Sequence, residues 1–101
     1  MTTVALLASQ QPTEALDLGI AWARAGDDVT VVLLDGATGI LRAGHAAAGL
    51  LERAHDAGVQ VWAHGAALDE RAIAHDARVA AVDLDRLAVL VAETASKVQW
   101  W

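Results

Sequence analysis

Five short apolar runs, separated by segments that favour helices, restrict the fold of this sequence more than any other feature. The runs lie at residues 4–8, 29–34, 59–63, 79–82 and 97–101. Each is bounded by turn-forming residues, a pattern typical of strands that are covered on both faces. Parallel strands need long crossover connections, and the intervening segments supply them. The sequence therefore predicts a single three-layer α/β domain over residues 1–101, with a mostly parallel sheet of about five strands flanked by helices.

Turn residues and apolar spacing predict the helices between these runs. Thr13 is expected to cap the first helix, and Gly26 is expected to follow its end. A short helix is predicted over residues 68–74, and Asp83 is expected to cap the last helix. The residues of that last helix predicted to face the core are Leu84, Leu87, Leu90 and Val91.

Composition and charge exclude several classes of protein. Hydrophobic residues make up 55% of the chain and charged residues 20%, which excludes intrinsic disorder. The net charge is -6 with only 7 lysines and arginines, so we expect no direct contact with nucleic acid. No apolar run is long enough to cross a bilayer, and the N-terminus lacks the basic start of a secretory signal. We expect a cytoplasmic protein with no membrane partner.

The sequence contains no cysteine. Disulfides, thiolate nucleophiles, iron–sulfur clusters and cysteine-ligated zinc are therefore impossible within this chain. Histidine is present at four positions, but no pair has the i, i+4 spacing of a zinc helix. We predict no metal site and no cofactor.

Ligands of open parallel sheets bind outside the carboxyl ends of the strands, so the loops at those ends are the candidate binding segments. The segment Asp35–Gly39 follows the second run, and its backbone amides could approach an anion around Asp35, Gly36 and Thr38. It lacks the lysine of a P-loop. The alternative is an ordinary turn from strand to helix that needs glycine.

His64 and Arg71 are the other candidates at this edge of the sheet. His64 ends the third run and is the best single candidate for a general acid or base, although no serine or cysteine partner is visible. Arg71 and His75 are expected to share one helix face and could bind an anion. A solvated helix surface is the alternative for this pair.

Trp100 and Trp101 end the chain and must point to opposite faces of the last strand. We expect one to pack inward against the terminal helix, around Leu87 and Val91. The other is expected to face a subunit interface, where aromatic residues are enriched.

Three stretches resemble the sulfur-relay family that contains DsrE, DsrF and DsrH, most closely its TusB/DsrH branch. The first is Gly26-Asp27 before an apolar strand, with Asp35-Gly36 after it. The second is Val61-Trp62-Ala63 followed by Leu68-Asp69-Glu70-Arg71, and the third is Val82-Asp83, an apolar helix and Lys97-Val98-Gln99-Trp100. Two departures stand out. Ala72 follows Arg71 where the family has glycine, so we expect ordinary helix there, and Trp101 is an extra residue at the end.

The resemblance implies a role. The catalytic relatives carry a persulfide on a cysteine just after the third strand, where this chain has Ala63 and His64. It implies a non-catalytic subunit of a cytoplasmic TusBCD- or DsrEFH-like sulfurtransferase complex. The implied partners are DsrE/TusD-like and DsrF/TusC-like subunits, or further copies of the chain. Transfer RNA wobble-uridine 2-thiolation is the favoured pathway and dissimilatory sulfur metabolism the alternative. Two other hypotheses stay open: a stand-alone protein that binds a small anionic ligand at Asp35–Gly39 and Ser9–Thr13, and a small enzyme that uses His64.

Overall fold

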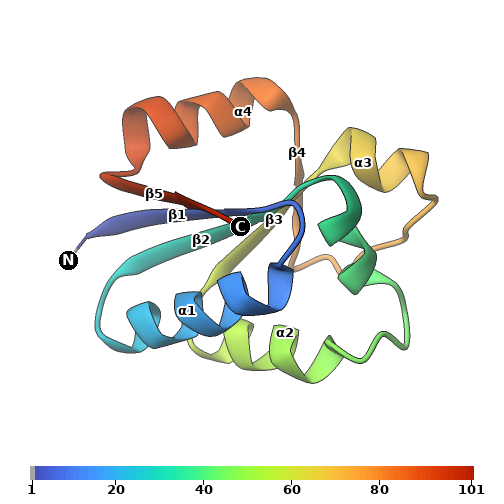
Figure 1. Cartoon of the computed structure of the whole chain (residues 1–101), viewed down its shortest axis with the longest axis horizontal. Helices are drawn as coiled ribbons and strands as arrows, with labels where there is room; N and C mark the ends of the chain where they lie inside the picture. The colour runs from blue at the N-terminus through green and yellow to red at the C-terminus, as the bar shows by residue number, and fades with distance from the viewer. Residues whose placement is uncertain (1) are drawn as a thin grey trace.

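The chain forms one five-stranded sheet in which every pairing is parallel (Figure 1). The structure is a computed structural model that describes residues 2–101. Along the sheet the strand order is β4-β3-β2-β1-β5. The strands are β1 (Thr3–Ala8), β2 (Asp28–Leu33), β3 (Gln60–His64), β4 (Ala80–Val82) and β5 (Lys97–Trp100). The helical segments are α1 (Pro12–Arg24), the 3-10 helix η1 (Asp35–Leu41), α2 (Ala48–Asp56), α3 (Gly65–Glu70), α4 (Leu84–Val89) and the π-helical turn η2 (Leu90–Thr94).

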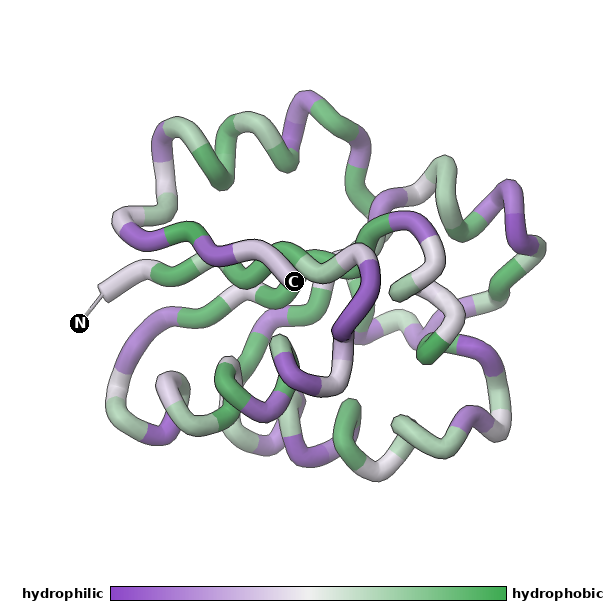
Figure 2. The backbone as a smooth tube through the Cα atoms, viewed as in Figure 1, coloured by the Kyte–Doolittle hydropathy of each residue, from purple (hydrophilic) through white to green (hydrophobic). Residues whose placement is uncertain are grey.

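The helices cover the two faces of the sheet unequally. Helices α1 and α2 lie on one face, and α4 with η2 lies on the other (Figure 1). The larger core includes Val31, Leu6 and Leu16 between the sheet and α1 and α2. The smaller core joins Leu7 and Val32 to Leu90. Figure 2 shows the central strands as mainly hydrophobic segments between these layers. The predicted three-layer α/β fold is confirmed.

Two predicted helix boundaries are confirmed. Gly26 follows α1 with a φ of 102°, a conformation that glycine adopts without strain. Asp83 caps α4, because its Oδ1 accepts a hydrogen bond from the backbone N–H of Arg86 at 2.8 Å.

One prediction about a helix start and one about a core residue are wrong. Thr13 is not a cap, because α1 already begins at Pro12, with Gln11 before it. Proline suits the first helical position, where its missing N–H would have had no partner within the helix. Leu84 does not face the core and is 61% exposed. It begins α4 two residues after the end of β4, an edge strand of the sheet, so little of the sheet lies beneath it.

Helix α3 ends earlier than its sequence predicts. Ala72 has a φ of 51°, which breaks the helix after Glu70. The backbone N–H of Ile73 then donates to the carbonyl of Leu68 at 3.0 Å, the pattern of a Schellman turn. The expectation that Ala72 continues the helix is therefore wrong, and so is the expectation that Arg71 and His75 share a helix face.

Candidate functional site

The carboxyl ends of the central strands are closed by helical segments that start there. The 3-10 helix η1 begins two residues after β2, and α3 begins directly after β3. Contact between η1 and α3 places both over this edge of the sheet. On the other side of β2, the loop after β1 is tied to the end of the chain, because the Trp101 carbonyl accepts hydrogen bonds from the N–H groups of Ser9 and Gln10 at 2.8 and 3.2 Å.

The segment from Asp35 is a helical turn. Asp35 is exposed and has a φ of 48°, a left-handed conformation that aspartate tolerates better than most residues. Thr38 is fully buried, and its hydroxyl donates to the Asp35 carbonyl at 2.8 Å. A Cβ at Gly36 would meet nothing within 4 Å. The Thr38 hydroxyl thus stabilises the turn, and a ligand in this segment would depend on Asp35 and on exposed backbone groups.

Ala63 and His64 end β3 and point to opposite faces of the sheet. Ala63 is fully buried in the larger core, whereas His64 is half-buried and lies beside Val82 of β4 in the strand register. His64 also precedes the first residue of α3. Of this pair, only His64 offers a side chain that solvent or a partner could reach.

Arg71 makes its contacts within its own helix and with a neighbouring arginine. Its Nη1 donates to the Ala67 carbonyl at 3.3 Å and lies 3.6 Å from the carboxylate of Glu70. The carbonyl of Arg71 accepts a hydrogen bond from Nη2 of Arg42 at 3.1 Å. These contacts link α3 to the segment after η1, and none of them brings Arg71 together with His64.

The two terminal tryptophans occupy different environments. Trp100 is 66% exposed, whereas Trp101 is partly buried against the larger core. The predicted contact of an inward tryptophan with Leu87 and Val91 is wrong. Val98 occupies that position, since it packs against the smaller core beneath α4. Strand alternation explains the difference, because Val98 and Trp100 share one face and Trp101 belongs to the other.

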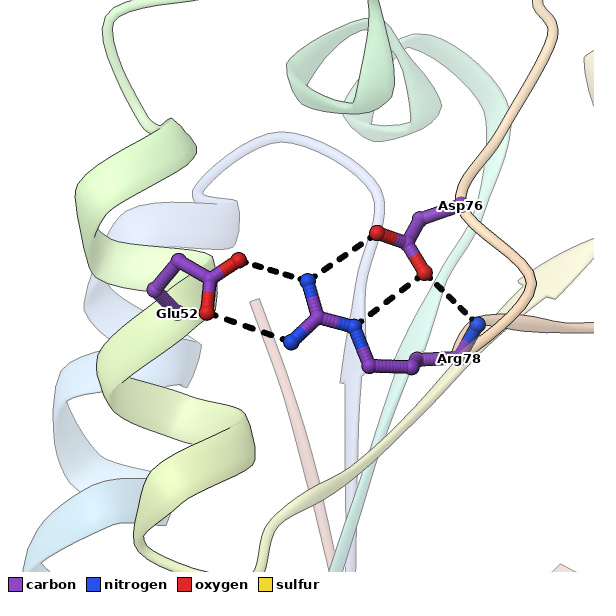
Figure 3. A network of polar contacts seen from close by, with 3 residues as sticks. All are labelled: Glu52, Asp76 and Arg78. Atoms are coloured by element: carbon purple, nitrogen blue, oxygen red, sulfur yellow. Dashed lines mark hydrogen bonds and ion pairs between the residues drawn. The ribbon is translucent and has the colours of Figure 1, made fainter.

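A polar network that the sequence did not suggest joins α2 to the segment before β4 (Figure 3). Arg78 forms a two-pronged contact with the carboxylate of Glu52, with Nη1 3.1 Å from Oε2. The same guanidinium contacts Asp76, with Nη2 3.0 Å from Oδ2. The network borders a cavity of about 240 Å³ whose wall also includes His55 and Leu51. Because Glu52 and Arg78 lie 26 residues apart, no local sequence pattern predicts this contact.

These contacts shift the pKa values of all three groups. Hydrogen bonds from Arg78 lower the pKa of Asp76 from 3.8 to about 2 and lower the pKa of Glu52 as well. The two carboxylates raise the pKa of Arg78 in return. All three side chains are substantially exposed. The network is therefore a surface ion-pair network that joins two elements, and it is not a buried acid–base site.

Residues 2–101 contain no group of three or more histidine, cysteine, aspartate or glutamate side chains placed to hold a metal ion. Within the same residues, every helix is too short or too polar to cross a bilayer.

Comparison with known proteins extends only to the fold. No protein-family model and no curated protein matches the sequence. Among solved structures, the chain is similar to MTH1491, a protein of unknown function from Methanobacterium thermoautotrophicum. The TM-score is 0.77 at 14% identity, and the match covers 98% of this chain and 100% of the other. At that identity the likeness shows a shared α/β fold over the whole length of both chains.

Proposed function

We propose that this chain is a non-catalytic subunit of a cytoplasmic sulfurtransferase complex of the TusBCD or DsrEFH kind, with tRNA wobble-uridine 2-thiolation as its favoured pathway. The observation that carries the proposal is which residues stand at the end of β3. Ala63 and His64 stand there, where the resemblance puts the persulfide cysteine of the catalytic relatives. The rest of the chain supplies no substitute, since it has no cysteine.

The chemistry of sulfur relay explains why a subunit without cysteine cannot carry the transferred sulfur. A thiolate attacks the outer sulfur of a donor persulfide, forms a new sulfur–sulfur bond and releases the donor as a thiolate. The acceptor must then hold the transferred sulfur covalently. The imidazole of His64 can move a proton, but it cannot replace a thiolate as the carrier. A subunit without a thiol therefore contributes to the complex through its surface.

The placement of the resembling stretches supports the same proposal. Gly26 ends α1 before β2, and Asp35 starts the turn after β2. The segment Lys97–Trp100 forms β5 beside β1 and leaves Trp100 exposed at the end of the strand. An exposed tryptophan is a suitable docking residue, because large aromatic side chains dominate many interfaces.

Co-purification tests the proposed assembly. The tagged chain, expressed at its native level in its own host, should bring down two companions of similar size. One companion should carry a cysteine just after its third strand. A chain that purifies alone under conditions where its genomic neighbours are expressed contradicts the proposal.

Mass spectrometry tests the non-catalytic role separately. After incubation with a persulfide donor, with or without its partners, the protein should keep its original mass. An adduct of one sulfur that is lost on reduction refutes the role. The variant His64→Ala should leave sulfur transfer by the assembled complex within about twofold of normal, as is usual for a residue outside the chemistry. Loss of an activity that the isolated chain has by itself would instead favour a small enzyme that uses His64.

A further inference from the structure

The face of the sheet beneath α4 carries a polar patch at the amino ends of the three central strands. Thr3 pairs with Asp28 between β1 and β2, and Thr30 pairs with Gln60 between β2 and β3. These side chains share a face with the residues of the smaller core, because each lies two or four positions before one of them. The central strands of a parallel sheet that is covered on both faces are usually apolar throughout. Polar side chains at this place are therefore unusual for the fold and indicate a role beyond packing.

The polar patch forms the floor of a cavity of about 300 Å³. Helix α4 and η2 supply the roof through Arg86, Val89, Leu90 and Thr94, and Trp62 of β3 completes the wall. The guanidinium of Arg86 lies over the ring of Trp62, 4.7 Å from its centre. This cation–π contact holds a positive charge at the wall.

The π-helical turn shapes the roof of the cavity. The N–H of Ala95 donates to the carbonyl of Leu90 at 2.8 Å, five residues back, which makes this turn wider than an α-helical one. The residues at the two ends of the turn, Leu90 and Thr94, both line the cavity. Single π turns of this kind recur at functional sites.

Thr30 provides the observation that points to a ligand. The residue is only 5% exposed, and its hydroxyl makes no hydrogen bond within residues 2–101. No side-chain oxygen or nitrogen in that range is both sealed from solvent and without a partner. The Thr30 hydroxyl therefore keeps contact with solvent, and because Thr30 lines the cavity, an occupant there can satisfy it.

We propose that this cavity binds a small zwitterion of the α-amino acid class. Its walls carry one anionic group, Asp28, and one cationic group, Arg86. An ammonium group matches the first and a carboxylate matches the second. The hydroxyl of Thr30 and the amide of Gln60 serve the remaining polar atoms.

The size and the charges of the cavity favour this class over others. About 300 Å³ is at the lower end of the volumes found for small-molecule pockets, which suits an amino acid and excludes a dinucleotide. A ligand with several phosphates would meet the carboxylate of Asp28. Val89 and Leu90 offer apolar contact to a side chain. The site lies at the amino ends of the strands, so it is independent of the proposed sulfur-relay role of the opposite edge.

Titration of the whole chain with free L-α-amino acids tests the site. Calorimetry should detect binding by at least one of them. Amide chemical shifts in NMR spectra should change around Thr30, Gln60, Trp62 and Arg86. The methyl ester and the N-acetyl derivative of the best ligand each lack one charge, and each should bind about tenfold more weakly or worse.

Variants identify the groups that bind. Arg86→Gln and Asp28→Asn should each weaken binding about tenfold or more, and Thr30→Val should weaken it several-fold while preserving the shape of the side chain. Arg53→Gln and Asp56→Asn on α2 are the matched controls on the opposite face and should bind normally. Far-UV circular dichroism and the melting temperature confirm that each variant folds.

Three results overturn the proposal. The first is the absence of binding by every free amino acid tested. The second is binding that moves resonances only outside this cavity. The third is an affinity for the Arg86 or Asp28 variant equal to that of the natural protein, or an affinity for the ester or the N-acetyl derivative equal to that of the free amino acid. None of these results affects the co-purification test of the sulfur-relay proposal.

Discussion

Ala72 is the residue whose backbone conformation is least suited to its side chain. Its φ of 51° lies in the left-handed region, where a Cβ crowds the following carbonyl. The chain accepts this strain because the turn directs Ile73 into the larger core. Ala72→Gly should therefore stabilise the protein by about 0.5–1 kcal/mol, the relief of strain less the greater entropy of the unfolded chain. Urea unfolding monitored by tryptophan fluorescence measures the change.

Ala66 supplies the matched control for this prediction. It is exposed inside α3, six residues before Ala72, so Ala66→Gly should destabilise the protein by about 0.5–1 kcal/mol. Effects of the same sign at both positions would contradict the left-handed conformation of Ala72.

The terminal tryptophans are predicted to contribute unequally to stability. Trp101 packs against the larger core, and its truncation to alanine should cost about 2–4 kcal/mol, somewhat less than for a fully buried aromatic residue. Trp100→Ala should change the folding free energy by less than about 0.5 kcal/mol, as is usual for an exposed site. Thermal unfolding of the two variants compares them directly. Equal losses would contradict the observed packing.

At the scale of elements, the Glu52–Arg78–Asp76 network fastens α2 to the segment before β4 (Figure 3). The folded-state pKa of Asp76 is lowered to about 2, so its contribution to stability is complete above its ordinary pKa of 3.8. That contribution is lost as the pH falls toward 2. Arg78→Gln should therefore be less stable than the natural protein at neutral pH, and the difference should shrink between about pH 5 and pH 2.

Arg24→Gln is the control for this pH dependence. Arg24 ends α1 and forms no ion pair among residues 2–101. The unfolding free energy of this variant, measured by urea unfolding, should change with pH in parallel with that of the natural protein over the same range. A gap for Arg78→Gln that stays constant with pH would show that the ion pairs do not carry the effect.

At the scale of the whole molecule, the exposed hydrophobic residues gather on one side. Among residues 2–101 the large ones are Leu84, Val89 and Trp100, with exposures of 61%, 49% and 66%. The first two lie on α4, and Trp100 extends from β5 on the face that α4 covers. One short helix with its π turn covers this face of the sheet, whereas α1 and α2 share the other (Figure 1).

We expect the working protein to be an oligomer that uses this side. Trp100→Ala should weaken assembly by about 2–4 kcal/mol, the range of interface hot spots, while the folded subunit stays intact. Light scattering and analytical ultracentrifugation, with the chain alone and with its genomic neighbours' products, measure the assembly. A strict monomer in every case would contradict the expectation. Trp22→Phe on α1 is the control and should assemble normally.

The sequence by itself determined the features that depend on neighbouring residues. The five strands and the parallel crossovers follow from the lengths and spacing of apolar runs, and the caps at Gly26 and Asp83 follow from local turn chemistry. The absence of a thiol is a covalent fact that no fold can alter. The sequence does not predict the end of α3, because Ala72 occupies the left-handed position where such a turn normally has glycine.

Only the tertiary structure decided which distant residues meet. Strand order and register place Thr30 beside Gln60 and bring both beneath the helix that carries Arg86. Glu52 reaches Arg78 for the same reason, across 26 residues of chain. Spacing along a sequence determines the face of one element, but contact between elements depends on how they pack, since packing is set by the whole core.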